Sequence, residues 1–269
     1  MYWQKRFKRE DPDQELEEVL LAIRSEHKDY GYRRMVKELE CRGYHINKKK
    51  VQRLMKKLGI QVRSFTTRSR KYSSYRGRVG KIATNRLRRR FKTSVPNQKM
   101  TTDTTEFKYM EEDEKGILRT RKLYLDPYMD LYNLEIISYR ISEKPNAEAI
   151  LAALAEAVKK TEQCPYRRTF HSDQGWAYQM KSYVKYLKKN RIFQSMSRKG
   201  NCLDNSVMEN FFGIMKQEMY YGKEYRSFSE LQTAIEEYIE YYNHKRMKER
   251  LNWLSPVQYR LRKMNMLSA

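Results

Sequence analysis

The sequence has few cysteines and no long apolar run. Its three cysteines lie far apart without a C-x-x-C pair, and its four histidines show no zinc-ligand spacing. No apolar run approaches the roughly 18 residues that span a bilayer. The opening MYWQKRFKRE lacks the apolar stretch of a signal peptide. We therefore expect reduced thiols, a cytoplasmic location and no membrane partner.

Acidic residues are absent from Cys41 to Thr102, a stretch that carries 20 Lys and Arg. The whole chain has 57 basic against 33 acidic residues, a net charge of +24. Such an excess favours a polyanionic partner. Residues 61–98 are rich in Arg, Ser and Thr with interleaved aromatics, which is typical of a linker. We expect this basic linker to follow DNA phosphates and to order on binding; the alternative is a plain tether.

Three helices are predicted in residues 1–60. Asp11 and Pro12 can start the first, Gly43 ends the second, Asn47 can cap the third and Gly59 ends it. The third helix, KKKVQRLMKKLG, has a basic exposed face that could enter a major groove. The alternative is a solvated face packed on the rest of the protein. The candidate DNA contacts are Lys48, Lys49, Gln52, Arg53 and Lys56.

Strands and helices alternate in the rest of the chain. Strand-like runs are expected at residues 101–110, 123–129, 134–141, 168–172 and 192–195. The first three predict an antiparallel meander joined by an acidic, exposed turn at 111–116. Helices are expected at 147–160 with Asn146 as its cap, at 180–190, around Glu209, from the capping box at 227–230 that begins with Ser227, and from Ser255 and Pro256. The order βββαβαβα predicts an α/β layered fold.

Three carboxylates are the candidate catalytic and metal-binding residues. Asp103 lies in a strand-like run, Asp173 follows another, and Glu209 lies in a helical pattern, with 35 residues between it and Asp173. Mg²⁺ takes oxygen ligands and shares phosphate oxygens. Two such ions can activate the attacking oxygen and stabilise the leaving one at phosphorus. The alternative is that all three are ordinary surface acids, but then each of the three would have to occur by chance in a sequence context that matches a catalytic motif.

The helix that carries Glu209 presents two further candidates. Lys216 lies seven residues after Glu209 and Asn205 four before it, so all three share one helix face. We expect Lys216 to hold DNA phosphate, with Asn205 beside it; the alternative is a solvated lysine. Residues 197–205 have the composition of a mobile loop that ends in a helix cap, with Asp204 as the candidate.

Three other titratable residues lie near these positions in the sequence. Asp126 and Asp130 could be mistaken for the second catalytic aspartate, and we rank both as structural because the HSDQG motif and the 35-residue gap favour Asp173. His171, two residues before Asp173, is expected to be buried or to orient the site.

Five blocks of the sequence resemble the OrfB transposase of insertion-sequence-3 type mobile elements. They are TTDTTEF, HSDQG with a following Tyr178, KGNCLDNSVMENFF, the segment 238–259, and the segment 30–60, which resembles the helix-turn-helix of that family. Met100, Asn133 and Asn210 depart from the usual pattern, but no departure removes a carboxylate. The resemblance covers nearly the whole chain.

The resemblance implies a retroviral-integrase-like core of RNase H fold and a DDE transposase. We expect a helix-turn-helix-like domain at 1–60, a basic linker at 61–98, the catalytic core at 99–222 and a helical extension at 223–269. Implied cofactors are two Mg²⁺ ions, for which Mn²⁺ can substitute. Implied partners are the element's terminal inverted repeats, target DNA, further copies of the chain on DNA, and an upstream OrfA product or OrfAB fusion. Bound to DNA, the protein would associate with the nucleoid.

Two other classes of function remain open from the residues. A non-catalytic DNA-binding regulator would account for the basic half of the chain but leaves the three carboxylates without a role. A nuclease of RNase H type would use the same carboxylates with water alone, and it has little need of the long acid-free stretch.

Overall fold

The computed structural model describes residues 12–62, 80–199 and 202–268, which fall into two compact units. Residues 12–62 belong to the N-terminal unit and the remainder to the core unit. Asp11 and the first part of the expected linker lie outside the described residues. Within the described ranges, every helix is too short or too polar to cross a membrane.

The N-terminal unit is a bundle of three short helices, as the sequence predicts. Asn47 caps the third helix, because its side chain accepts a hydrogen bond of 2.9 Å from the backbone N–H of Lys49. Gly43 and Gly59 follow the second and third helices with φ of 89° and 66°, a left-handed conformation that favours glycine. The helices are α2 (Gln14–Glu26), α3 (Tyr32–Cys41) and α4 (Lys48–Lys57). Their buried residues are Leu16, Leu20, Ile23, Met35, Leu39, Val51, Leu54 and Met55.

The core unit contains a mixed sheet of six strands. The order is β2-β3-β1-β5-β6, and β4 pairs with the other side of β3. The pairs β1·β5 and β5·β6 are parallel and the others antiparallel. The strands are β1 (Lys99–Thr102), β2 (Thr105–Glu112), β3 (Leu118–Asp130), β4 (Ile136–Ser142), β5 (Thr169–Ser172) and β6 (Phe193–Met196).

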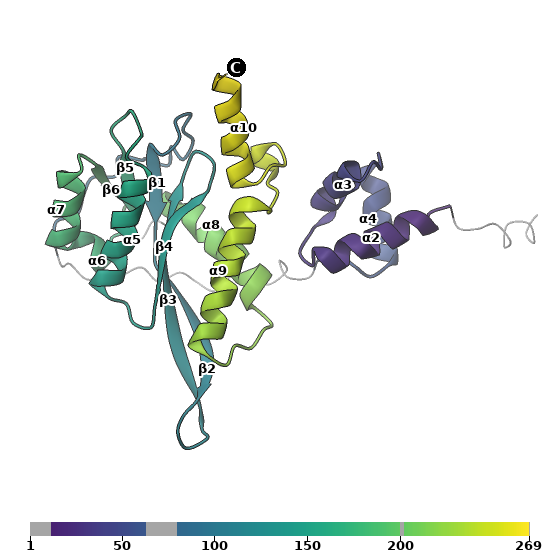
Figure 1. The fold of residues 1–269 in the computed structure, drawn as a ribbon, viewed down its shortest axis with the longest axis horizontal. Helices are drawn as coiled ribbons and strands as arrows, with labels where there is room; N and C mark the ends of the chain where they lie inside the picture. Colours follow the sequence, from purple (N-terminus) through teal and green to yellow (C-terminus); the bar gives the residue numbers. More distant parts are fainter. Residues whose placement is uncertain (1–11, 63–79, 200–201, 269) are drawn as a thin grey trace, which may run out of the picture. The chain divides into compact units, whose positions relative to one another are not determined.

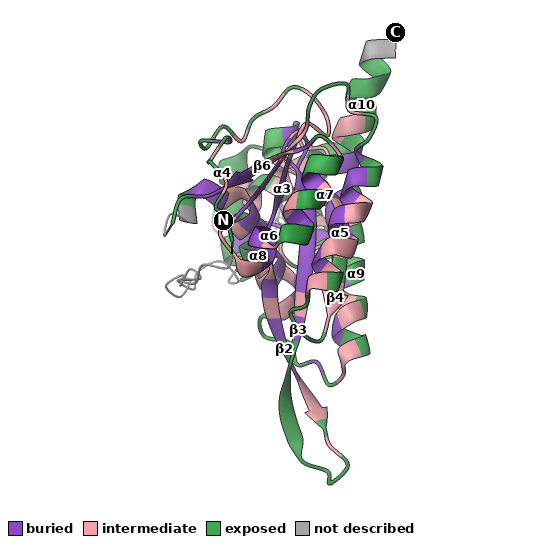
Figure 2. Cartoon of the chain, turned by 90° about the vertical axis from the view of Figure 1, so that its left-hand side faces the viewer, coloured by how far each residue is buried: buried purple, intermediate pink, exposed green. Residues whose placement is uncertain are grey.

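The first predicted strand is in fact two strands, which corrects the expected element order. The break falls at Asp103 and Thr104, where the carboxylate of Asp103 accepts a 2.8 Å hydrogen bond from the backbone N–H of Thr104. This local bond competes with strand pairing. Four strands, not three, therefore precede the first helix of the core unit. Strands β2 and β3 form a long hairpin with the acidic turn at its tip, which is exposed, as expected (Figure 2).

Helices cover both faces of the sheet (Figure 1). On one face lie α5 (Ala147–Lys160), α6 (Trp176–Gln179) and α7 (Lys181–Lys189); the helix expected at 180–190 is separated from α6 by Met180, which is extended. On the other lie α8 (Ser206–Met215) and α9 (Phe228–His244). Asn146 caps α5 and Ser227 caps α9, as predicted. The remaining helices are η1 (Cys202–Asn205), η2 (Lys216–Tyr220), η3 (Glu249–Leu251) and α10 (Pro256–Ser268).

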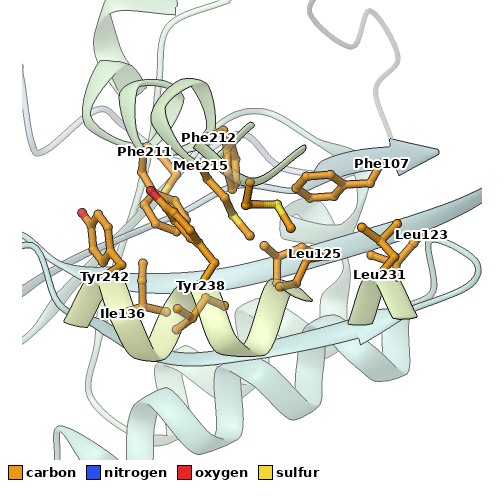
Figure 3. Packing of buried hydrophobic residues seen from close by; sticks show 14 of the residues in the cluster. Phe107, Leu123, Leu125, Ile136, Phe211, Phe212, Met215, Leu231, Tyr238 and Tyr242 are labelled. Atoms are coloured by element: carbon orange, nitrogen blue, oxygen red, sulfur yellow. The ribbon is translucent and has the colours of Figure 1, made fainter. Parts of the chain in front are cut away.

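Each face of the sheet has its own hydrophobic core. On the α5 side, Met100, Tyr128 and Phe170 from the sheet pack with residues of α5 and α7. On the other side, Leu123 and Leu125 pack with residues of α8 and α9 (Figure 3). Helix α9 lies after the domain boundary expected between residues 222 and 223, yet it shares this core with α8. That boundary and the rest of the four-part division stay predictions.

Candidate active site

The topology of the sheet brings Asp103 and Asp173 together. Strands β1 and β5 run parallel side by side, and Thr101 faces His171 in their register. Asp103 and Asp173 lie two residues beyond this pair, each directly after its strand. Two carboxylates therefore project from the carboxyl ends of neighbouring parallel strands, a frequent place for ligand sites in α/β folds.

Glu209 comes from α8, whose first turn is tied to β1. The side-chain oxygen of Asn205 accepts a hydrogen bond of 2.6 Å from the Thr101 hydroxyl. The Asn205 amide nitrogen donates to the backbone oxygen of Thr102 at 3.2 Å. Glu209 follows one helical turn later and is half-buried. These bonds fix the start of α8 beside the strand that leads to Asp103.

Asp173 and Glu209 both lie within electrostatic reach of Asp103. The pKa of Asp103 is raised well above its usual value, first by burial, then by the negative charge of Asp173, with a smaller effect from Glu209. Burial also raises the pKa of Asp173, against a hydrogen bond from the Gly175 backbone N–H, and the pKa of Glu209. Among the described residues, no cation forms an ion pair with any of the three. The three carboxylates are therefore not neutralised by ion pairs within the described ranges, although the charge of Lys216 interacts with that of Asp103.

A fourth carboxylate, Asp126 on β3, lies close to this group. It is buried, its Oδ1 accepts a hydrogen bond of 2.5 Å from the Thr104 hydroxyl, and its Oδ2 has no hydrogen-bond partner in the described part of the chain. Its charge contributes to the raised pKa of Asp103. The sequence ranks Asp126 as structural; only the pairing of β2 with β3 places it beside Thr104.

Lys216 begins η2, a π-helical turn, and Asn205 precedes α8, so regular α-helix geometry covers Ser206–Met215 and neither of these two residues. The Lys216 ammonium donates a 2.9 Å hydrogen bond to the backbone oxygen of Glu106 and lies 5.0 Å from the centre of the Phe107 ring. Burial lowers its pKa, while the charges of Glu106 and Asp103 oppose that shift. It is half-buried beside the site and not a fully solvated lysine.

Other residues singled out in the sequence have structural contacts. Asn205 is buried, and both polar atoms of its amide are bonded to β1. Asp130 is buried and accepts bonds from the backbone N–H groups of Asn97 and Tyr132. Asp204 is not a helix cap as expected: Asn205 precedes α8, and the Asp204 carboxylate pairs with two arginines. His171 is buried and orients neighbouring groups, as expected.

The candidate DNA-binding residues of α4 all lie on its exposed side. Part of the basic face is neutralised within the N-terminal unit: Asp13 forms ion pairs of 2.5 Å with both Lys50 and Arg53, and Glu17 pairs with Lys57 at 2.6 Å. Lys48, Lys49, Gln52 and Lys56 remain on the exposed face.

The donor set of the site suits a hard divalent cation. Carboxylate oxygens are the ligands that Mg²⁺ and Mn²⁺ prefer, and here the charges of Asp173 and Glu209 both act on Asp103. As they stand, no three His, Cys, Asp or Glu side chains in the described ranges are grouped closely enough to hold a metal ion. Like charges repel one another, so a shared ion would have to draw these carboxylates together.

Comparison with known proteins gives consistent matches along the chain. Residues 94–202 and 209–264 match two integrase core domain families, and residues 11–69 match an HTH-like domain family. A transposase-like protein of Haemophilus influenzae is 50% identical over 82% of this chain and 95% of its own length. The InsK protein for insertion sequence element IS150 of Escherichia coli is 47% identical over 86% of this chain and 77% of its own. Transposase InsF for insertion sequence IS3A of the same species is 32% identical over 90% and 80%.

Among solved structures, the HTLV-2 integrase catalytic core domain in complex with magnesium matches 57% of this chain and 91% of its own. The sequence identity is 16% and the TM-score 0.42.

Proposed function

Because the chain belongs to the insertion-sequence-3 family of transposases, with an integrase core domain of RNase H-like fold, we propose that Asp103, Asp173 and Glu209 are its catalytic residues. The enzyme is a polynucleotidyl transferase that acts on DNA in the transposition of an insertion sequence element. The observation that supports the three residues is their approach from β1, β5 and α8: the pKa of Asp103 is raised first by burial and then by the charges of Asp173 and Glu209.

The same three carboxylates would hold the divalent cofactor, which we propose to be two Mg²⁺ ions, with Mn²⁺ able to substitute. When bound, such a pair activates the attacking oxygen and stabilises the leaving one at phosphorus. Burial of Asp103 and Asp173 weakens their hydration, which favours a cation ligand over bulk water. Lys216 uses one of its three N–H donors on the Glu106 backbone oxygen, so donors remain for a DNA phosphate beside Asp103.

We propose that α4 and the basic linker hold the DNA for this site. The substrates would be the element's terminal inverted repeats and target DNA, bound by several copies of the chain. An upstream OrfA product or an OrfAB fusion would supply further DNA binding, and the protein would act in the cytoplasm at the nucleoid. The exposed lysines of α4 and the acid-free stretch that follows support a DNA partner.

A strand-transfer assay with labelled element-end DNA and Mg²⁺ or Mn²⁺ tests the catalytic assignment. Wild-type protein should give joined products, and Glu209→Gln should give none. Glu237→Gln is the matched control, because Glu237 is an exposed glutamate on α9. Full activity of Glu209→Gln would refute the assignment. Cleavage without joining in the wild type would favour the nuclease reaction.

A further inference from the structure

Part of the basic segment before β1 is packed onto the core unit. The backbone N–H groups of Arg86 and Leu87 both donate to the hydroxyl of Ser195 on β6, at 2.9 and 3.2 Å. Leu87 is buried, and the guanidinium of Arg86 lies 4.3 Å from the centre of the Phe193 ring. This segment therefore has a fixed place on the edge strand of the sheet.

The segment reaches the buried carboxylate of Asp204. The Asn85 amide nitrogen donates to Asp204 Oδ2 and the Arg89 guanidinium to Oδ1, both at 2.9 Å. Arg198 binds the same carboxylate with two side-chain N–H groups at 2.9 Å and with its backbone N–H at 3.0 Å. The Asp204 side chain is 0% exposed. A buried carboxylate depends on such partners, because an unpaired charge in the protein interior is strongly destabilising.

The turn that presents Arg89 is held in an unusual backbone conformation. Arg88 and Arg89 have φ of 46° and 61°, a left-handed conformation that costs a residue with a Cβ about 1 kcal/mol. The turn is closed by a hydrogen bond of 2.8 Å from the Arg88 backbone N–H to the Asn85 side-chain oxygen. The contact with Asp204 helps to offset the cost of the turn.

The backbone of Asp204 belongs to a second network that leads to β5. His171 Nε2 lies 2.9 Å from the Asp204 carbonyl oxygen, which can only accept, so this nitrogen carries the proton. His171 Nδ1 then accepts from the Ser195 hydroxyl at 2.9 Å. Ser195 in turn accepts from the backbone of Arg86 and Leu87. Residues 85–89 therefore hold Asp204 in two ways. They bind its side chain directly, and they bind its backbone indirectly through Ser195 and His171.

Asp204 lies in η1, which continues directly into α8 and Glu209. The next residue, Asn205, is bonded to β1. The start of α8 is thus fixed by β1 on one side and by residues 85–89 on the other. The orientation of a helix that supplies a ligand depends on such contacts, and losing a partner behind a metal ligand typically costs about 10- to 100-fold in metal affinity or activity.

We propose that Asn85 and Arg89 are positioning residues for Glu209, acting through Asp204. Residues 85–89 of the basic linker would thus connect the two proposed domains and also support the helix that carries Glu209. This inference rests on the proposed catalytic role of Glu209.

The test compares full-length Arg89→Ala with Arg88→Ala. Both arginines are exposed and left-handed and carry the same charge, but of these two only Arg89 is paired with Asp204 in the described part of the chain. At saturating element-end DNA, we expect Arg89→Ala to raise the Mn²⁺ concentration for half-maximal cleavage by about tenfold or more. Arg88→Ala should keep the wild-type value. Arg89→Lys, which retains the charge but not the forked donors, should fall between them.

A second measurement needs no activity. Amide hydrogen exchange of residues 206–215 should become faster in Arg89→Ala, and faster still in Asp204→Asn, while Arg88→Ala should match the wild type. Equal metal dependence and equal exchange in Arg89→Ala and Arg88→Ala would overturn the proposal. Glu209→Gln, assayed in parallel, separates the two hypotheses: if it retains activity, the catalytic assignment fails, whereas the exchange result still decides whether residues 85–89 support α8.

Discussion

The hydroxyl of Thr101 donates a buried hydrogen bond of 2.6 Å to the side chain of Asn205, joining β1 to the start of α8. Each of these residues lies shortly before a candidate catalytic carboxylate. Asp103 follows Thr101 by two residues, and Glu209 follows Asn205 by one helical turn. The distance between two acids that are far apart in sequence is therefore set by a pair of neutral side chains.

Asn205→Ala should destabilise the core unit by about 1–3 kcal/mol, because it leaves the buried Thr101 hydroxyl and the Thr102 carbonyl without their partner. Urea unfolding measures the loss. Asn190→Ala is the control, since the Asn190 amide donates only within its own helix region, to the Tyr186 carbonyl. Equal losses in the two variants would contradict the importance of the contact between β1 and α8.

Gly175→Ala should reduce strand transfer by about tenfold or more while changing stability little. A Cβ at this position would lie 2.9 Å from Asp173 Oδ1, so the carboxylate would have to rotate and lose the bond from the Gly175 N–H. Misplacing a reacting group by about 1 Å can cost about 100-fold.

Gly213→Ala on α8 is the control for that substitution, because nothing lies within 4 Å of its Cβ position. Alanine there should raise the free energy of unfolding by up to about 1 kcal/mol, as usual for glycine in a helix. If both alanine variants kept full activity, the role given to the Asp173 carboxylate would be wrong.

The stability of the core unit should depend on pH through Asp130. Burial raises the pKa of Asp130 to about 7, opposed by the N–H groups of Tyr132 and Asn97 and by Arg260, and reinforced by Glu135. The unfolded value is about 4. The folded chain therefore binds the proton more tightly, so this stabilisation is complete below about pH 4 and is lost as pH rises through 7.

Asp130→Asn should remove that dependence. Urea unfolding of the metal-free protein should show the variant gaining stability relative to the wild type between pH 5 and pH 8. A difference that stays constant over this range would mean that Asp130 remains ionised in the folded protein.

Removing only one partner of the ion pair between Arg246 and Glu218 should strongly destabilise the core unit. Their side chains are only 3% and 4% exposed, and Glu218 also accepts a hydrogen bond from the Tyr238 hydroxyl. Arg246→Met should cost about 3–5 kcal/mol, because it leaves a buried carboxylate without its cation. Adding Glu218→Gln should recover part of the loss, since the amide keeps an acceptor for Tyr238 but no charge. A double-mutant cycle by chemical unfolding measures both, and additive losses would contradict the pairing.

Local features of the fold were predictable from the sequence. Asn47, Asn146 and Ser227 cap the expected helices because a cap acts over two or three residues, a distance that the sequence displays directly. The three carboxylates could be named from their motifs and spacing. Their approach could not, because it depends on the parallel pairing of β1 and β5 across an intervening hairpin, strand and helix.

The features missed from the sequence depend on contacts between distant residues. Asp204 has the residue type and position of a helix cap, yet its partners Asn85 and Arg89 lie more than 100 residues away. Asp126 carries no motif, and only the sheet places it beside Thr104. At the break, Asp103 is a residue with low strand propensity, but a single such residue within a run of Thr and aromatic residues is too weak a signal to predict the break.

DNA binding through α4 should show in the salt dependence of affinity. Lys49→Ala and Lys56→Ala remove exposed cations of the face that we propose to contact DNA, and each should reduce the slope of log K against log salt by about 1 if it releases one counterion. Lys57→Ala is the control, because that lysine is already paired with Glu17 at 2.6 Å and its removal should leave the slope nearly unchanged. Fluorescence anisotropy with element-end DNA at several salt concentrations measures all three. If Lys57→Ala lowered the slope as much as the other two, the contribution would come from the net charge of the unit and not from this face of α4.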